Sequence, residues 1–231
     1  MLVRRDISNG VTKFRPDSSF RAKSACGRGV PDHDFVRRYA IFSPSSACEP
    51  ACCGCRPDGR SRATSPVYPC SSVSAQHRVV EIGSYRGNST IALAKGAASG
   101  NRAWIYAIDP HVEYVGPKGG VYGPRDQAAL YQNIVRNRVG ELVAVVSLPS
   151  KAAAKAWHGQ SIGLLWIDGD HRYEGVRSDL DSWYPHVISG GLIAFHDSDD
   201  EGVQRAISEA IHDRQLIRVG RQKALTWFSK P

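Results

Sequence analysis

The sequence has no apolar run near the ~18 residues that a bilayer-spanning helix needs. Its N-terminus, MLVRRDISNGVTKF, carries basic residues without a continuous apolar stretch after them, which is a poor secretory signal. We therefore expect a cytoplasmic protein that is not bound to a membrane. Cysteine is also confined, because all six cysteines lie at or before Cys70. The rest of the chain has no thiol for a disulfide or for covalent attack on a nucleic-acid base.

The last two thirds of the chain have little net charge. Residues 1–78 hold 13 Lys and Arg against 6 Asp and Glu, a net charge of +7, whereas residues 79–231 hold 17 against 16. The basic isoelectric point of about 9.3 therefore belongs to the first third. The remainder has no basic stripe and no N-P-P-Y amino-methylation motif, so a nucleic-acid partner is not indicated for it.

Residues 1–76 show neither a helical nor a strand period, and Pro, Ser, Arg and Gly recur throughout them. Apart from a short apolar run at 35–42, such a segment buries too little apolar surface to offset its ordering entropy. We predict a poorly structured extension over 1–76 and one domain over 77–231. Five cysteines at 48, 52, 53, 55 and 70 contain one C-x2-C pair, which leaves a zinc site open, but the second pair lacks that spacing.

From residue 77 onward, short apolar runs alternate with amphipathic stretches. The pattern predicts strands at 79–82, 104–108, 142–147, 162–167, 192–195, 216–219 and 224–228. Helices are predicted from residue 88 and over 126–138, 150–157, 173–188 and 201–213, with Asn88, Ser89 and Thr90 as N-cap residues. Alternating strands and helices predict an α/β fold with a Rossmann-like, doubly wound, mostly parallel seven-stranded sheet. The last two strands have no helix between them, so we expect an antiparallel hairpin that turns near Gly220.

Polar residues or glycines follow each of the first five predicted strands. Because ligands bind beyond the carboxyl ends of strands in open α/β sheets, these residues are the candidates for a site. They are Glu81 and Gly83, Asp109, Ser147, Asp168 with Asp170 and His171, and His196 with Asp197.

The first of these loops reads E-I-G-S-Y-R-G. Gly83 and Gly87 allow the backbone to pass close to a ligand, and the next helix offers free N–H groups to a carboxylate or phosphate. Asp109 can accept hydrogen bonds from both hydroxyls of a ribose. The G-x-G-x-x-G fingerprint of dinucleotide binding is missing, which disfavours a nicotinamide oxidoreductase. The loop indicates an adenosine-type cofactor with an amino-acid tail.

Together with Asp109 and the terminal hairpin, E-I-G-S-Y-R-G resembles class I S-adenosylmethionine (SAM) methyltransferases. The segments I-D-G-D-H-x-Y and G-G-x-I-x-x-H-D further resemble a bacterial subfamily related to the macrolide-sugar and catechol-type O-methyltransferases. The resemblance covers about residues 79–228. It implies that Asp109 binds the ribose, that Ser147 lies near the adenine, and that the first loop and Asp168 line the methionine part; the loop residues are Glu81, Gly83, Ser84, Tyr85 and Gly87.

The same resemblance implies a metal and a base. Asp168 and Asp197 fall where catechol-type enzymes hold a divalent ion such as Mg²⁺, and His196 is a third candidate ligand. Those enzymes usually follow the second aspartate with Asn, whereas this chain has Ser198. His171 falls at the position of their catalytic lysine, and histidine is the side chain best suited to take a proton near neutral pH. The resemblance thus implies His171 and Asp168 as catalytic residues.

We therefore expect a SAM-dependent methyltransferase that methylates an oxygen of a small hydroxylated acceptor, such as a sugar or a glycoside. The segment 111–124, with Tyr122 and Arg125, is expected to contact that acceptor. Two other functions stay open: an RNA methyltransferase, suggested by the basic first third, and a catalytically degenerate member kept as a SAM-binding scaffold. The sequence leaves the oligomeric state open, a homo-oligomer included.

Overall fold

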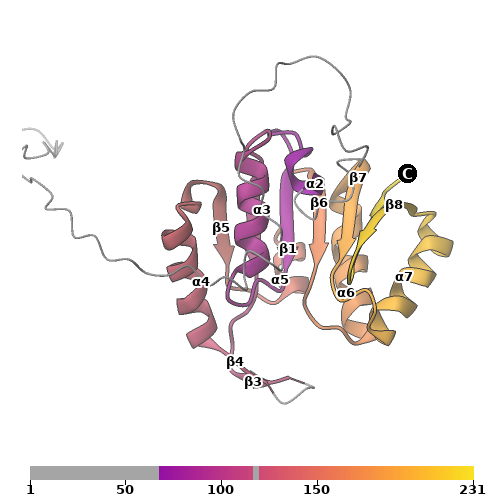
Figure 1. Ribbon diagram of the computed structural model, residues 1–231. Coiled ribbons are helices and arrows are strands. Elements are labelled where there is room, and N and C mark those ends of the chain that lie inside the picture. The colour runs from indigo at the N-terminus through magenta and orange to yellow at the C-terminus, as the bar shows by residue number, and fades with distance from the viewer. Residues whose placement is uncertain (1–67, 117–119) are drawn as a thin grey trace, which may run out of the picture. The chain divides into compact units, whose positions relative to one another are not determined.

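The computed structural model describes residues 68–116 and 120–231 (Figure 1). Residues 1–67 of the predicted extension 1–76 lie outside the described residues. They include the apolar run at 35–42 and four of the five cysteines considered for zinc. Cys70 is described. It is buried, and its Sγ donates a hydrogen bond to the carbonyl of Leu93 at 3.1 Å.

One seven-stranded sheet forms the centre of the described domain, in the order β5-β2-β1-β6-β7-β9-β8. Neighbouring strands are parallel from β5 to β7, whereas β9 lies antiparallel to both β7 and β8. The predicted sheet and its closing hairpin are confirmed. The strands are β1 (Arg78–Ile82), β2 (Trp104–Ile108), β5 (Val143–Val146), β6 (Ile162–Ile167), β7 (Val187–Phe195), β8 (Ile217–Gln222) and β9 (Leu225–Ser229).

Helices cover both faces of this sheet, as the doubly wound pattern predicts. On one face α3 packs against both α2 and α4, and Figure 1 shows α3 and α4 in front of the strands. On the other face α6 packs against both α5 and α7, over a cluster of buried apolar side chains. The helices are α2 (Tyr68–Ser71), α3 (Asn88–Ala98), α4 (Pro124–Asn137), α5 (Ser150–Lys155), α6 (Tyr173–Trp183) and α7 (Glu201–Arg214), with short 3-10 turns at Gly140–Leu142 and Tyr184–His186.

The end of α6 differs from the prediction of a helix over 173–188. The helix ends at Trp183, because Pro185 has no N–H to continue the ladder, and the chain passes through a 3-10 turn into β7 at Val187. The predicted strand thus begins five residues early. Its glycines pair with the last strand's extension: Gly190 N donates to Lys230 O, and Lys230 N donates to Gly191 O, both at 2.8 Å.

The turn of the terminal hairpin also differs from the prediction. Gln222 pairs with Leu225, so Lys223 and Ala224 form the turn, and Lys223 adopts a φ of +53°. Gly220, where the turn was expected, lies inside β8 next to a shift in the pairing register.

The segment 111–124, expected to be a loop, contains a small hairpin. It is formed by β3 (Tyr114–Val115) and β4 (Val121–Tyr122), and α4 begins directly after it at Pro124, two residues earlier than predicted. None of the helices in the described parts of the chain combines the length and apolar character that crossing a bilayer requires.

Candidate active site

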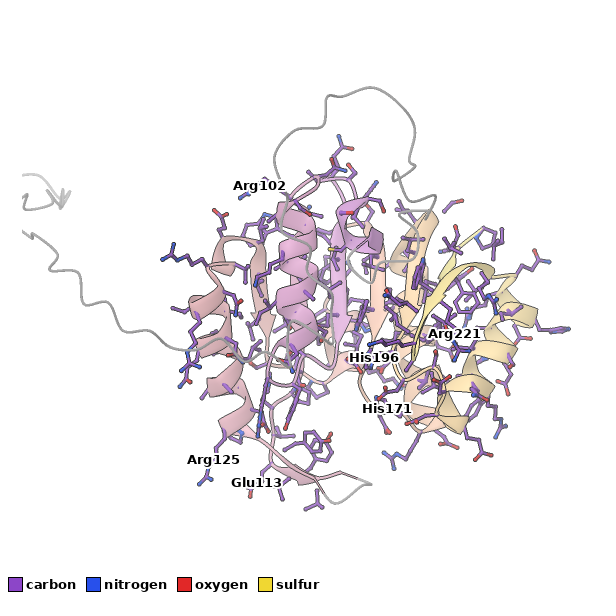
Figure 2. All side chains as sticks on the ribbon, viewed as in Figure 1. Arg102, Glu113, Arg125, His171, His196 and Arg221 are labelled. Atoms are coloured by element: carbon purple, nitrogen blue, oxygen red, sulfur yellow. The ribbon has the colours of Figure 1, made fainter. Side chains whose placement is uncertain are left out.

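The carboxyl ends of β1, β2, β6 and β7 meet at one edge of the sheet, because the backbone pairing continues past each strand. Gly83 N donates to Ile108 O and Asp168 N donates to Ile82 O, both at 2.9 Å, and His196 N donates to Ile167 O at 3.0 Å. The polar residues that follow these strands are therefore brought side by side. Figure 2 shows His171 and His196 close together at this edge.

The glycine loop between β1 and α3 has little room for side chains. A Cβ on Gly83, whose φ is +86°, would lie 2.2 Å from the carbonyl oxygen of Asp168, so only glycine lets these strand ends approach. Gly87, with φ +85°, is the residue that caps α3, and no side chain hydrogen-bonds to this helix start. The predicted capping by Asn88, Ser89 and Thr90 is wrong, since all three lie in the first turn. The N–H groups of α3 therefore face the loop and suit an anionic group.

Glu81 lies at the end of β1 with its side chain fully buried. Thr90 Oγ1 donates a hydrogen bond to its Oε2 at 2.5 Å. Burial raises the pKa of Glu81 to about 8; the hydroxyls of Ser89 and Thr90 oppose that shift, while Asp168 and Asp109 add to it. A fully buried carboxyl group beside two more carboxylates gives this edge a strongly negative potential when it ionises.

Asp109, after β2, ties the glycine loop to the next loop. Its Oδ2 accepts a hydrogen bond from Tyr85 N and its Oδ1 accepts one from His111 N, both at 2.9 Å. His111 is buried, and its Nε2 lies 3.0 Å from the carbonyl oxygen of Tyr85. Tyr85 and His111 both have positive φ, +46° and +48°, so the two loops are held in a costly conformation that fixes the carboxylate. Each carboxylate oxygen keeps a further lone pair for a ligand.

Two histidines and two aspartates form a cluster at the ends of β6 and β7. His171 Nε2 lies 3.6 Å from Asp168 Oδ1, and His171 Nδ1 lies 3.4 Å from Asp197 Oδ2. His196 Nδ1 lies 3.1 Å from Asp168 Oδ1 and 3.3 Å from Asp197 Oδ1. Asp197 has a φ of +44°, another strained position at the site. The arrangement places each imidazole between the same two carboxylates.

The pKa shifts in this cluster follow from the placement of each imidazole between carboxylates. Burial alone would raise the pKa of Asp168, but the two histidines outweigh it and hold the pKa below its usual value. Asp168 is also the main cause that raises the pKa of His171. Burial lowers the pKa of His196, and the nearby Asp168 and Asp197 more than reverse that effect. Asp168 is thus held ionised and the two imidazoles favour protonation; a divalent cation bound here would take the place of the imidazolium protons as the positive charge.

The cluster meets the first requirement of a metal site. One donor atom each from Asp168, His171 and Asp197 lies within 4.8 Å of the others. Carboxylate oxygens with an imidazole nitrogen suit divalent ions such as Mg²⁺, Mn²⁺ or Zn²⁺. The sequence suggested His196 as the third ligand, and its Nδ1 also lies near both carboxylates, so the geometry allows either histidine.

Other predicted residues are less central. Ser147 is exposed after β5, where Gln127 Nε2 donates to its hydroxyl. Asp170 is held by Arg172 through both carboxylate oxygens, at 2.6 to 3.0 Å. Ser198 faces away from the cluster, because its Oγ lies 2.9 Å from Thr226 Oγ1 of β9.

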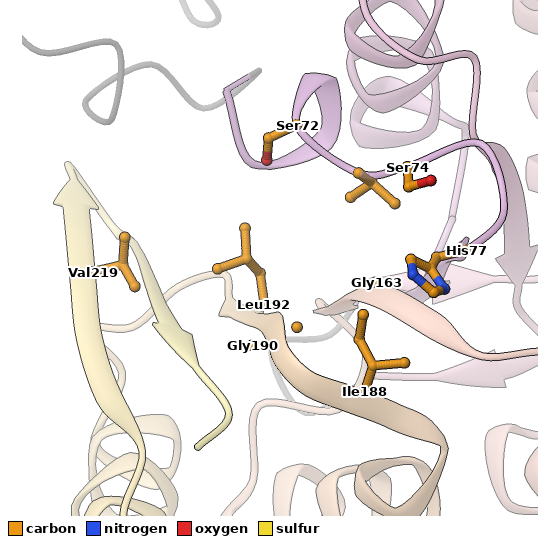
Figure 3. A pocket seen from close by; sticks show the side chains of 10 residues that line it. Ser72, Ser74, His77, Gly163, Ile188, Gly190, Leu192 and Val219 are labelled. Carbon is orange, nitrogen blue, oxygen red and sulfur yellow. The ribbon is translucent and has the colours of Figure 1, made fainter. Parts of the chain in front are cut away.

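Two residues of the site were missed from the sequence. Asp200 Oδ2 lies 3.3 Å from His171 Nδ1, and the acidic run after His196 was the signal that could have found it. His111, which supports Tyr85 and Asp109, left no signal because its role depends on a positive φ. At the opposite end of the sheet, a pocket is lined mainly by small and aliphatic residues (Figure 3). The one imidazole in its lining, that of His77, forms a hydrogen bond between its Nδ1 and Ser161 Oγ at 2.8 Å. We place the site at the carboxyl edge.

Residues 80–198 match the family model described as "Methyltransferase domain". Protein y4gI of Sinorhizobium fredii is 27% identical over 127 residues, which cover 53% of this chain. The chain spans only 13% of that relative's length.

Solved structures show the same fold. Cofactor-bound Rv0187 from MTB aligns with a TM-score of 0.53 at 19% identity, covering 71% of this chain and 78% of its own. CalS11, a TDP-rhamnose 3'-O-methyltransferase of calicheamicin biosynthesis, aligns with a TM-score of 0.52 at 15% identity, covering 71% and 75%. At such identities these likenesses concern the fold.

Proposed function

The chain belongs to the methyltransferase-domain family, and from this membership we propose that it is a SAM-dependent O-methyltransferase acting on a small hydroxylated acceptor. The main observation that supports this proposal is that Glu81, Asp109 and Asp168 lie at the same edge of the sheet. No lysine or arginine among the described residues forms an ion pair with any of the three. Because Glu81 is protonated near neutral pH, the carboxylates of Asp109 and Asp168 are the groups that favour a cationic ligand, and SAM carries both a sulfonium and an ammonium group.

The cofactor fits the remaining features of the edge in the proposed orientation. The start of α3, whose N-cap Gly87 makes no side-chain hydrogen bond, suits the carboxylate of the methionine part. The loop residues Glu81 to Gly87, with Ser84 and Tyr85 between them, would surround that part. The free lone pairs of Asp109 would accept the two ribose hydroxyls. Ser147 would lie at the adenine end, where Gln127 orients its hydroxyl.

Methyl transfer requires an acceptor oxygen that has lost its proton or is losing it. We assign proton acceptance to His171, which stands between the two aspartates at the centre of the cluster and lies partly open to solvent. Asp168 orients that imidazole through their contact. Asp168, Asp197 and His196 would hold a divalent cation, which supplies charge to polarise the acceptor hydroxyl. Holding both reactants at one edge accounts for a further part of the acceleration.

A sugar or glycoside is the proposed acceptor. The fold of CalS11, which is a sugar O-methyltransferase, supports this choice only as a likeness. The segment 111–124 with Tyr122 and Arg125 follows directly after Asp109, the proposed ribose ligand, so it is the proposed acceptor side of the site.

Titration calorimetry with S-adenosylhomocysteine (SAH) tests the proposal. We expect saturable binding to the wild type and a loss of at least tenfold in affinity for Asp109→Ala, because the ribose loses its acceptor. The exposed Asp213→Ala on α7 is the matched control and should bind as the wild type does. Absence of SAH binding to the wild type, or equal binding by Asp109→Ala, would overturn the assignment.

A further inference from the structure

Three tyrosines form a cluster beside the glycine loop. The rings of Tyr114 and Tyr122 are stacked, with centroids 4.9 Å apart and an interplanar angle of 14°. Tyr85, from the glycine loop, contacts the ring of Tyr122 edge-on at 5.3 Å and 61°. Figure 1 shows the β3–β4 hairpin, which carries Tyr114 and Tyr122, projecting beyond the sheet next to the start of α4.

The hairpin backbone enforces this arrangement. Tyr114 and Tyr122 are a directly opposed pair in the β3–β4 register, so their rings leave the hairpin on the same face. Gly116 N donates to Gly120 O at 2.8 Å, and a Cβ on Gly116 would lie 2.7 Å from Tyr122 Cε2. Glycine at that position therefore leaves room for the ring, and the stack is a fixed feature of the hairpin.

The stack adjoins the glycine loop through the ring of Tyr85. Tyr85 N is bound by Asp109, so the edge-on ring belongs to the loop that we assign to the cofactor. Burial raises the pKa of Tyr114, and Tyr122, Asp109 and Asp170 raise it further.

Tyr114 is 51% exposed, although one face of its ring is stacked on Tyr122. About half of a large aromatic side chain therefore remains in water beside the glycine loop. Covering it with an apolar ring face would bury further apolar area and add an aromatic contact. An open-chain polyol has no such face to offer.

We propose that the exposed face of Tyr114, held in place by Tyr122 and Tyr85, is the platform on which the ring of the methyl acceptor stacks. The site would then select acceptors whose hydroxyl is carried by a six-membered ring with an apolar face, over open-chain alcohols. This inference rests on the proposed function, because it concerns the acceptor side of the same site.

Binding to the SAH-saturated full-length protein tests the platform without requiring turnover. The ring probes are catechol and methyl glucoside, which separate an aromatic ring from a sugar ring, and erythritol is the open-chain probe. The variants are Tyr114→Leu, which removes the ring, Tyr114→Phe, which keeps it, and Tyr131→Leu, a control at another half-exposed tyrosine on α4. Circular dichroism and SAH affinity establish that each variant is folded.

We expect at least one ring probe to bind the wild type, and Tyr114→Leu to weaken that probe about tenfold while Tyr114→Phe and Tyr131→Leu leave it within about twofold. Erythritol should bind more weakly and should not distinguish the variants. Absence of ring binding, equal ring binding by Tyr114→Leu, or equal losses in Tyr114→Phe and Tyr114→Leu would overturn the platform. Ring binding without methyl transfer from SAM would instead remove the proposed function and leave the platform standing.

Discussion

Replacing Glu81 with Gln should make the ligand-free protein more stable at alkaline pH. Glu81 is fully buried and its pKa is raised from 4.5 to about 8, mainly by burial. Between these two values the folded protein keeps a proton that the unfolded chain has released, so the free energy of unfolding falls as pH rises. The stability that protonated Glu81 contributes, relative to its charged form, is fully present below pH 4.5 and is lost as the pH rises to about 8.

The size of the effect follows from that window. Each unit of pKa difference corresponds to about 1.4 kcal/mol, so the full window is worth about 5 kcal/mol as an upper estimate. Gln has the same shape and no charge, and its amide oxygen can still accept the hydrogen bond from Thr90. Glu81→Gln should therefore match the wild type near pH 4.5 and exceed its stability by about 2 to 5 kcal/mol at pH 8.

Urea unfolding at several pH values between 5 and 8.5 measures this difference. Other titrating groups are common to both proteins, so they cancel in the comparison at each pH. Glu113→Gln, which changes an exposed carboxylate, is the matched control and should show no such growing difference. The reasoning is refuted by a Glu81→Gln difference that stays constant with pH, or by a variant less stable than the wild type at pH 8.

Three further outcomes are expected. Gly83→Ala should lower the free energy of unfolding by about 2 kcal/mol or more and abolish SAH binding, because the added Cβ would meet the backbone of Asp168 and residue 83 has a positive φ. Urea unfolding measures the stability and calorimetry the binding, and near-wild-type values would contradict the close approach of the two loops. Asp197→Asn should lower kcat about 100-fold or more with little change in SAH affinity, and unchanged turnover would remove Asp197 from the reacting centre. Excess chelator should lower the turnover of the wild type, and full activity in chelator would remove the metal from the proposal.

The sequence pattern predicted the fold correctly because the features that indicate strands and helices are local in the chain. Continuous apolar runs of four to six residues indicate strands buried on both faces, and the lack of a helix between the last two indicates a hairpin. The misplaced boundaries lie where a local signal was ambiguous. The predicted strand at 192–195 leaves out Gly190 and Gly191, yet their backbone groups pair with Lys230, a long-range partner that no local window contains.

The candidate site divides in the same way. The sequence by itself determined which residues follow the strands, and parallel pairing then brings Glu81, Asp109 and Asp168 to one edge. Only the tertiary structure decided where their neighbours point: Ser198 turns toward Thr226 of β9, and Tyr114 stacks on Tyr122 beside the glycine loop. The physical reason is that the positions of strands and helices along the chain follow from short-range periodicity, whereas side-chain direction at the site depends on positive-φ turns and on contacts between segments far apart in the chain.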